Sequence, residues 1–109
     1  MELYHGSNIV VSVPEIRTPS HRLDFGTGFY TTTSFDQAKR WSINKAKLEG
    51  MGSAMVSVFC VSDDFLQDQN LDILDFKEAD EQWLDFVIAN RTDKDFTFQH
   101  DIVKGAVAN

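Results

Sequence analysis

The sequence has 109 residues, room for one domain, and 42% of them are hydrophobic, which is enough for a core. Seventeen Asp and Glu residues against ten Lys and Arg residues give a net charge of −7, which disfavours nucleic acid as a partner. The single cysteine, Cys60, excludes an intramolecular disulfide and a Cys-rich metal site. No apolar run approaches the roughly 20 residues of a membrane helix, and no leader is recognisable, so we expect a cytoplasmic protein without a membrane partner.

The first third of the chain reads as short strands and a long loop. β-branched and aromatic residues predict strands over residues 2–5, 9–13 and 29–33. Residues 17–28, rich in Pro, Ser and Gly, separate the second strand from the third. A loop of this length in so small a domain typically carries function.

A helix is predicted to follow, over residues 34–49. Ser34 and Gln37 have the spacing of a capping box, in which each side chain accepts from the backbone N–H of the other residue. Two glycines end the helix, at positions 50 and 52. One apolar face of this helix is expected to pack on the core, and it contains Ala38, Trp41, Lys45 and Leu48.

The second half predicts two or three strands and a helix. The apolar run 54–61 indicates a strand buried on both faces, with Cys60 as an inert buried thiol. Residues 71–76 and 96–103 read as further strands, and residues 80–91 as a helix with an acidic start and a terminal Arg91. This order does not alternate regularly, so the expected fold class is α+β, with small mixed sheets and two main helices.

Three short motifs carry little information by themselves. Asp24-Phe25-Gly26 spells the metal-binding tripeptide of protein kinases, but the other kinase motifs are missing. The G-x-G of Gly26 and Gly28 lacks the third glycine of a dinucleotide-binding fingerprint. The three histidines show no metal-ligand spacing, so no metal site is predicted.

Two segments are more informative together. The first is LYHGS at 3–7, and the second is FGTGFYTT at 25–32, which leads into the helix with Trp41. With them the sequence resembles the ADP-ribosyltransferase superfamily, in the branch that uses a His, a Tyr and a third polar or acidic residue. The similarity extends to a group of bacterial proteins that share YHGS, DFGxGFYTT, an AxxW helix, a helix ending in NR and a closing strand like HDIVKGAVAN. It covers residues 1–109 as a single domain.

The resemblance implies a site for NAD, used as a substrate, without a metal. The histidine that matches His5 binds a ribose hydroxyl, and the backbone at Gly6 pairs with the nicotinamide carboxamide. Tyr30 stacks on the nicotinamide ring, and Trp41, eleven residues later, is the candidate for the opposite wall. His5 and Tyr30 are the expected catalytic residues. The resemblance also places Ser7, Gly28 and Phe29 at the cofactor.

Each of these residues also has a purely structural interpretation. His5 could be a strand-end histidine bonded to backbone, Tyr30 a core residue and Trp41 a packing residue on an apolar helix face. Gly26 and Gly28 could simply shape a turn. The occurrence of all of them in the family's order favours the NAD site.

The third catalytic residue has no clear match. Family members place it on a late strand, expected beyond a segment like GAVAN, so this chain is expected either to be truncated at its C-terminus or to use an internal residue. The internal candidates Glu78, Glu81 and Asp101 are poor ones, because the first two suit the start of a helix. A basic group in the long loop is either a contact for the NAD pyrophosphate or a solvated surface, and it comprises Arg17, His21 and Arg22.

Two functions therefore stay open. The first is an NAD-dependent transferase that releases nicotinamide and attaches ADP-ribose to an unknown acceptor, expected to be a protein; a role as the toxin of a bacterial toxin–antitoxin or effector system rests on analogy. The alternative is a non-catalytic interaction module that binds a partner, or forms a homo-oligomer, through an exposed sheet edge. An RNA-cleaving toxin is disfavoured because the sequence has no basic face.

Overall fold

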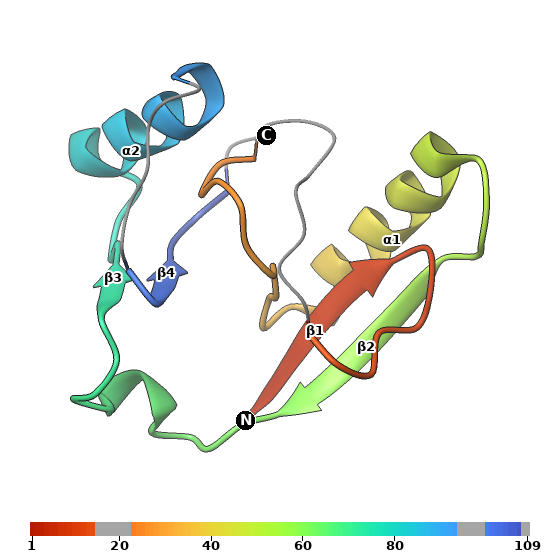
Figure 1. Ribbon diagram of the computed structural model, residues 1–109, viewed down its shortest axis with the longest axis horizontal. Helices are drawn as coiled ribbons and strands as arrows, with labels where there is room; N and C mark the ends of the chain where they lie inside the picture. Colours follow the sequence, from red (N-terminus) through yellow and green to blue (C-terminus); the bar gives the residue numbers. More distant parts are fainter. Residues whose placement is uncertain (15–22, 94–99, 108–109) are drawn as a thin grey trace. The chain divides into compact units, whose positions relative to one another are not determined.

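The computed structural model describes residues 1–14, 23–93 and 100–107, which divide into two compact units (Figure 1). The first unit contains the segment that starts at Met1, together with Phe29–Phe65. The second contains the segment that ends at Gly28, together with the chain from Leu66 onward. Each unit combines helix and sheet, which confirms the α+β class. Among the described residues, no helix has the length and apolar character needed to cross a membrane.

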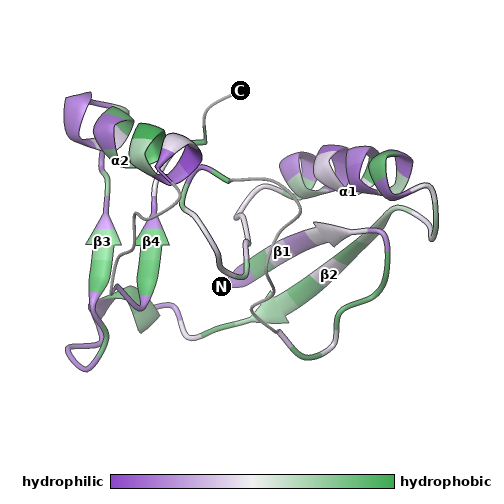
Figure 2. Ribbon diagram, turned by 45° about the horizontal axis from the view of Figure 1, so that its top comes forward, coloured by the Kyte–Doolittle hydropathy of each residue, from purple (hydrophilic) through white to green (hydrophobic). Residues whose placement is uncertain are grey.

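The first unit is a two-stranded antiparallel sheet with one helix. Strand β1 (Glu2–Ser7) pairs with β2 (Met55–Cys60), so that Tyr4 lies opposite Val58 and Gly6 opposite Val56. Helix α1 (Phe35–Glu49) runs along this sheet (Figures 1 and 2). On the other edge of β1, Thr32 forms an isolated bridge with Tyr4.

Helix α1 has the predicted ends but only half of the predicted capping box. Ser34 Oγ accepts from the Gln37 N–H at 3.2 Å, and Gly50 closes the helix at φ 65°. Thr32 Oγ1 instead takes the place expected for the Gln37 side chain: it accepts from the Ser34 N–H at 3.1 Å and itself lies 2.6 Å from Gln37 Oε1. These bonds join the start of α1 to the residue that pairs with β1.

The face by which α1 packs differs from the predicted one. Ala38 and Ser42 are buried, whereas Trp41 and Leu48 are 44% and 67% exposed. Small residues face the sheet because the helix lies very close to β1: a Cβ added at Gly6 would lie 2.2 Å from the Ala38 carbonyl oxygen. Large side chains therefore lie on the flanks of the helix.

The second unit is a two-stranded parallel sheet with one helix. Strand β3 (Ile73–Asp75) pairs with β4 (Ile102–Lys104), and α2 (Glu81–Thr92) lies between them in the chain. Asp80 caps α2 by accepting from the Trp83 N–H at 3.0 Å. A short 3₁₀-helix, η1 (Phe65–Gln67), spans the junction in sequence between the two units.

Several predicted strands are wrong or shorter. Residues 9–13 form no strand; there the Val11 N–H donates to Ser57 Oγ at 2.9 Å. Residues 29–33 contribute only the bridge at Thr32. Of the predicted strand 96–103, residues 102 and 103 belong to β4, which extends to Lys104, and residues 96–99 lie outside the described part.

Strand β2 is not buried on both faces, as its apolar run had predicted. Val58 is 51% exposed, and Cys60 is exposed rather than buried. A neighbouring strand covers an edge and not a face; within the described residues, α1 packs on this sheet, mainly against β1, so the faces of β2 are covered only in part. Figure 2 shows the hydrophobic colouring along most of this strand.

Candidate functional site

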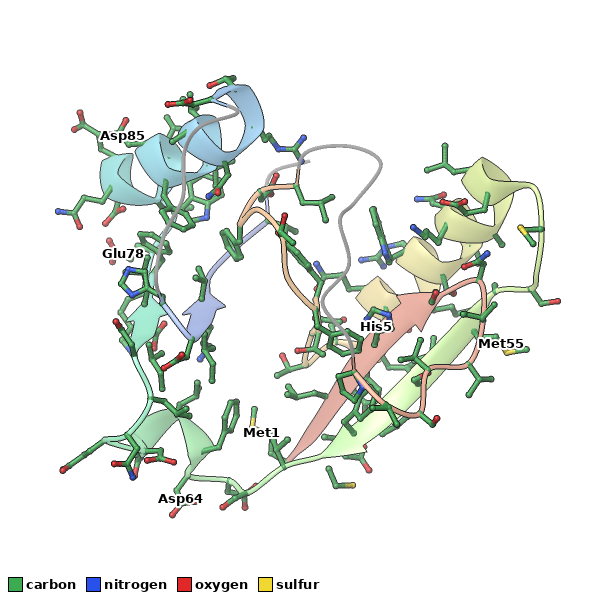
Figure 3. The ribbon with its side chains drawn as sticks, viewed as in Figure 1. Met1, His5, Met55, Asp64, Glu78 and Asp85 are labelled. Atoms are coloured by element: carbon green, nitrogen blue, oxygen red, sulfur yellow. The ribbon has the colours of Figure 1, made fainter. Side chains whose placement is uncertain are left out.

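His5 lies on β1 in the first unit and is held from two directions (Figure 3). Its Nδ1 lies 2.6 Å from the Tyr30 carbonyl oxygen, and its ring stacks on Phe29 with the centroids 4.2 Å apart. A carbonyl oxygen can only accept, so Nδ1 carries the proton in this bond, which leaves Nε2 as the acceptor of the uncharged ring form. Residues 25 positions apart therefore meet, as expected for the candidate site, although Tyr30 contributes its backbone to this contact.

The edge of β1 next to this histidine offers a donor and an acceptor. Met1 and Val61 exchange backbone hydrogen bonds at 2.9 Å, so by alternation His5 also bonds to β2. Tyr4 directs its N–H and C=O the other way, to Thr32, at 2.8 and 2.9 Å. Gly6, two residues further, shares the orientation of Tyr4, and among the described residues no partner bonds its N–H or C=O.

The antiparallel pairing between β1 and the segment around Thr32 ends before it reaches Gly6. Continued in register from the bridge between Tyr4 and Thr32, it would place Tyr30 opposite Gly6. The structure has only the isolated bridge there, and the Tyr30 carbonyl bonds to His5 instead. The result, within the described residues, is a β1 edge at Gly6 whose N–H and C=O have no bonded partner, although Gly6 itself is buried next to the histidine that holds Tyr30.

Helix α1 explains why position 6 is glycine. The added Cβ would collide with the Ala38 carbonyl oxygen, so the side-chain direction of Gly6 points at α1. The unpaired backbone groups point along the sheet instead, toward the edge of Thr32. The glycine therefore serves helix packing, and its free backbone edge follows from where the pairing with Thr32 ends.

Trp41 lies on the flank of α1 that belongs to the same edge. Gln37 bonds to Thr32, the residue that marks this edge, and Trp41 follows Gln37 by one helical turn. With 44% of its surface exposed, Trp41 is no core residue. The side chain of Trp41 is therefore open to solvent in part on that flank of α1.

The remaining predicted cofactor residues have structural roles. Phe29 packs between His5 and Phe59, whose ring meets it edge-on at 5.7 Å. Ser7 is buried, with its hydroxyl 3.3 Å from Asn8 Oδ1. Gly28 has a negative or extended φ and no atom within 4 Å of an added Cβ, so the backbone does not require glycine there.

Sequence reasoning missed the partner of Asp24. This carboxylate is 4% exposed and accepts from the guanidinium of Arg91, at the end of α2, through Nε and a terminal nitrogen. Both residues belong to the second unit. The nearby Phe25 ring packs with Phe76 and Phe86. The signal in the sequence was an acid before a glycine-rich turn and a cation at a helix end, but each could be explained locally.

The candidates for a third catalytic residue lie in the second unit. Asp101 Oδ2 accepts from the Asp72 N–H at 2.8 Å, and Asp72 Oδ1 lies 2.8 Å from His100 Nδ1. Glu81 occupies the first turn of α2, where a carboxylate favours the helix dipole, and Glu78 is exposed. The basic loop group of Arg17, His21 and Arg22 lies outside the described residues.

Within the described residues, the groups whose pKa is shifted lie at the start of β1 and at Asp63, which bonds to it. A hydrogen bond to Glu2 raises the pKa of Tyr4, and the amino group of Met1, 2.7 Å from Asp63, lowers the pKa of that carboxyl. Three His, Cys, Asp or Glu side chains do not gather into a possible metal site anywhere in the described ranges. The chemistry on offer at the β1 edge is therefore hydrogen bonding and stacking.

Comparison with known proteins identifies the family but not the activity. No curated protein and no solved structure matches the chain. Residues 1–109 match the family described as "Protein of unknown function (DUF3990)". Since the match covers the whole length, the chain belongs to the DUF3990 family.

Proposed function

We propose that this chain is an NAD-binding domain of the ADP-ribosyltransferase type. The observation that carries the proposal is that, in the described part of the chain, no partner bonds the N–H or the C=O of Gly6, a buried residue next to a histidine bonded to Tyr30. A carboxamide has one acceptor and two donors, so it can pair with one backbone N–H and one C=O of the same residue. The edge at Gly6 fits the nicotinamide end of NAD in this respect.

Three side chains supply the rest of the site. Trp41 offers an exposed aromatic face for stacking on the nicotinamide ring, a contact worth on the order of 1 kcal/mol beyond its buried area. His5 presents Nε2 as an acceptor, suited to a ribose hydroxyl. Tyr30, whose backbone is held by His5, is the proposed second wall.

The proposed reaction breaks the bond between nicotinamide and its ribose. Nicotinamide leaves as a neutral molecule with the bonding electron pair, the acceptor's nucleophile forms the new bond to the ribose carbon, and the acceptor's proton is released. The groups described above act by positioning, because they hold the nicotinamide and the ribose while charge develops on the ribose. The acceptor is proposed to be a protein, and a role in a toxin–antitoxin or effector system remains a hypothesis by analogy.

The carboxamide contact can be tested with two small ligands. Nicotinamide should raise the melting temperature of the chain by mass action. Nicotinic acid should not, because its carboxylate has no N–H to donate to the Gly6 carbonyl and adds a negative charge. Equal shifts with both ligands, or none with nicotinamide and NAD at millimolar concentration, would contradict the proposed site.

The stacking contact can be tested by fluorescence. The chain has two tryptophans, and Trp83 is buried with its Nε1 donating to the Ala106 carbonyl at 2.8 Å. Nicotinamide should quench the emission, and Trp41→Phe should remove the saturable part of the quenching. A saturable signal that persists in Trp41→Phe would exclude Trp41 as a wall of the site.

The alternative function, a protein-interaction module, has support of its own from β2. Among the residues that the structure describes, this strand has an unpaired edge on the opposite side of the same sheet. The two proposals use different edges, so each can be tested separately.

A further inference from the structure

The outer edge of β2 carries unpaired backbone groups. Since Val61 bonds to Met1, alternation directs Ser57 and Phe59 toward β1 and directs Val56, Val58 and Cys60 away from it. Among the described residues, β2 has no neighbour on that side. An uncovered strand edge of this kind is a template for pairing with another strand.

The side chains at this edge are neutral and exposed. Strand β2 reads MVSVFC, without charge, proline or glycine, so it lacks the residues that usually protect an edge. Val58 is 51% exposed, and Cys60 is exposed as well. Strand β2 itself offers no counter-charge to a partner strand, and Lys39 beside it disfavours a basic one, so a neutral strand fits this backbone edge.

A groove beside α1 shows which side chains the partner strand needs. Val56 lies opposite Gly6, whose side-chain direction points at α1, so Val56, Val58 and Cys60 share the face that α1 covers. The groove has a volume of about 400 Å³ and is lined by Phe35, Lys39, Ser42, Ile43, Ala54 and Val56. A strand added to β2 would need small or branched apolar side chains on this face.

Strand β2 itself meets these requirements, so we propose that two copies of the chain pair through their β2 edges. In an antiparallel dimer, one register joins all three outward-facing residues: Val58 lies opposite its own copy, and Val56 lies opposite Cys60 of the second copy. Each of these pairs exchanges two backbone hydrogen bonds, about six in total. Cys60 of each copy then lies opposite Val56, beside the groove of the other copy, in a sheet of four strands.

Cysteine cross-linking tests the register in the full chain. The variant Val56→Cys places a thiol opposite the native Cys60 of the second copy, at a Cα separation of about 5.5 Å that a disulfide can span. Within one chain, these positions are four residues apart along an extended strand, too far for a disulfide. Mild oxidation should convert Val56→Cys to a covalent dimer, whereas the wild type and Val56→Cys/Cys60→Ser should remain uncross-linked.

Light scattering after size exclusion tests the dimer itself. The wild type should have twice the mass of the chain, and Val58→Lys should have the mass of one chain, because it places two like charges opposite each other. Val58 is half exposed, so its replacement should leave the monomer folded, as a circular dichroism spectrum would verify. A monomeric wild type at about 100 μM, or equal cross-linking with and without Cys60, would overturn the proposal. Nicotinamide binding should also be measured with Val58→Lys. If this monomeric variant still binds nicotinamide, the NAD site does not depend on the dimer, so the two proposals can fail separately.

Discussion

The two units are stabilised by different kinds of contact. In the first, α1 approaches β1 through small residues, with Ala38 and Ser42 buried and Gly6 leaving room for the helix. In the second, aromatic rings pack together and the buried Asp24 is neutralised by Arg91. Large side chains of α1 such as Trp41 and Leu48 therefore stay exposed, whereas α2 buries Trp83 and Val87 and exposes Leu84 and Ile88. The difference teaches that close helix–sheet approach limits side-chain size in the first unit, whereas ring packing and a charge pair stabilise the second.

The largest effect is expected where the buried carboxylate of the second unit loses its cation. Arg91→Ala removes the guanidinium from a carboxylate that is 4% exposed, and we expect a loss of about 2–3 kcal/mol in the free energy of unfolding. Urea denaturation measures this loss. Asp24→Asn/Arg91→Gln, which removes both charges, should lose less than Arg91→Ala. A double variant as unstable as the single one would show that the charge pairing is unimportant.

The close packing of the first unit can be tested by one methyl group. Gly6→Ala should destabilise the chain by about 1–3 kcal/mol, since the new Cβ would lie 2.2 Å from the Ala38 carbonyl oxygen. Gly28→Ala is the matched control, because no atom lies within 4 Å of its added Cβ and its φ is not positive. Thermal unfolding should separate the two variants, and equal melting temperatures would contradict the packing described for α1.

The two tryptophans sharpen the contrast between the units. Trp83→Phe should cost about 1 kcal/mol, because it deletes the hydrogen bond from Nε1 to the Ala106 carbonyl. Trp41→Phe should leave the stability almost unchanged, since Trp41 is 44% exposed, while it weakens nicotinamide binding. The account of Trp41 as a ligand-facing residue fails if Trp41→Phe destabilises the chain as much as Trp83→Phe does.

The smallest effect concerns the ion pair at the start of β1. The pKa of the Met1 amino group is raised and that of Asp63 is lowered, mainly by their mutual hydrogen bond. The pair therefore contributes fully between about pH 4 and pH 8, the ordinary values of the two groups. Its contribution is lost as the pH falls through the lowered pKa of Asp63 or rises through the raised pKa of the amine.

The variant Asp63→Asn tests this pH dependence. Both groups are exposed, so solvent screens the pair and the change should be small. The difference in melting temperature between wild type and Asp63→Asn should be greatest at neutral pH and shrink toward both extremes. A difference that is independent of pH would show that the ion pair does not contribute.

The sequence predicted the helices and their ends better than the tertiary contacts of the helices and strands. Local signals identified the caps Ser34 and Gly50 and the helix that Asp80 begins, because these depend on neighbouring residues only. The predicted burial of β2 was wrong, since an apolar run does not reveal whether other elements cover one face of a strand or both. The pairing of Asp24 with Arg91 joins residues 67 positions apart, and no local pattern encodes it.

The candidate site was predictable in part. The family resemblance led to His5 and Tyr30, which the structure joins by a hydrogen bond. It did not indicate that Phe29 is packed between His5 and Phe59, or that α1 accounts for the glycine at position 6. Both facts depend on tertiary contacts, which a motif in a single sequence does not contain.

The most direct test of the proposed NAD site is the backbone amide of Gly6, observed by ¹⁵N NMR during a titration with nicotinamide. The account predicts a saturable shift of the Gly6 amide, with little change at Val56 and Val58 on the opposite edge of the sheet. Nicotinic acid should not shift the NMR signal of the Gly6 amide. A Gly6 amide that does not move while nicotinamide binds, or shifts confined to the β2 edge, would contradict the central claim.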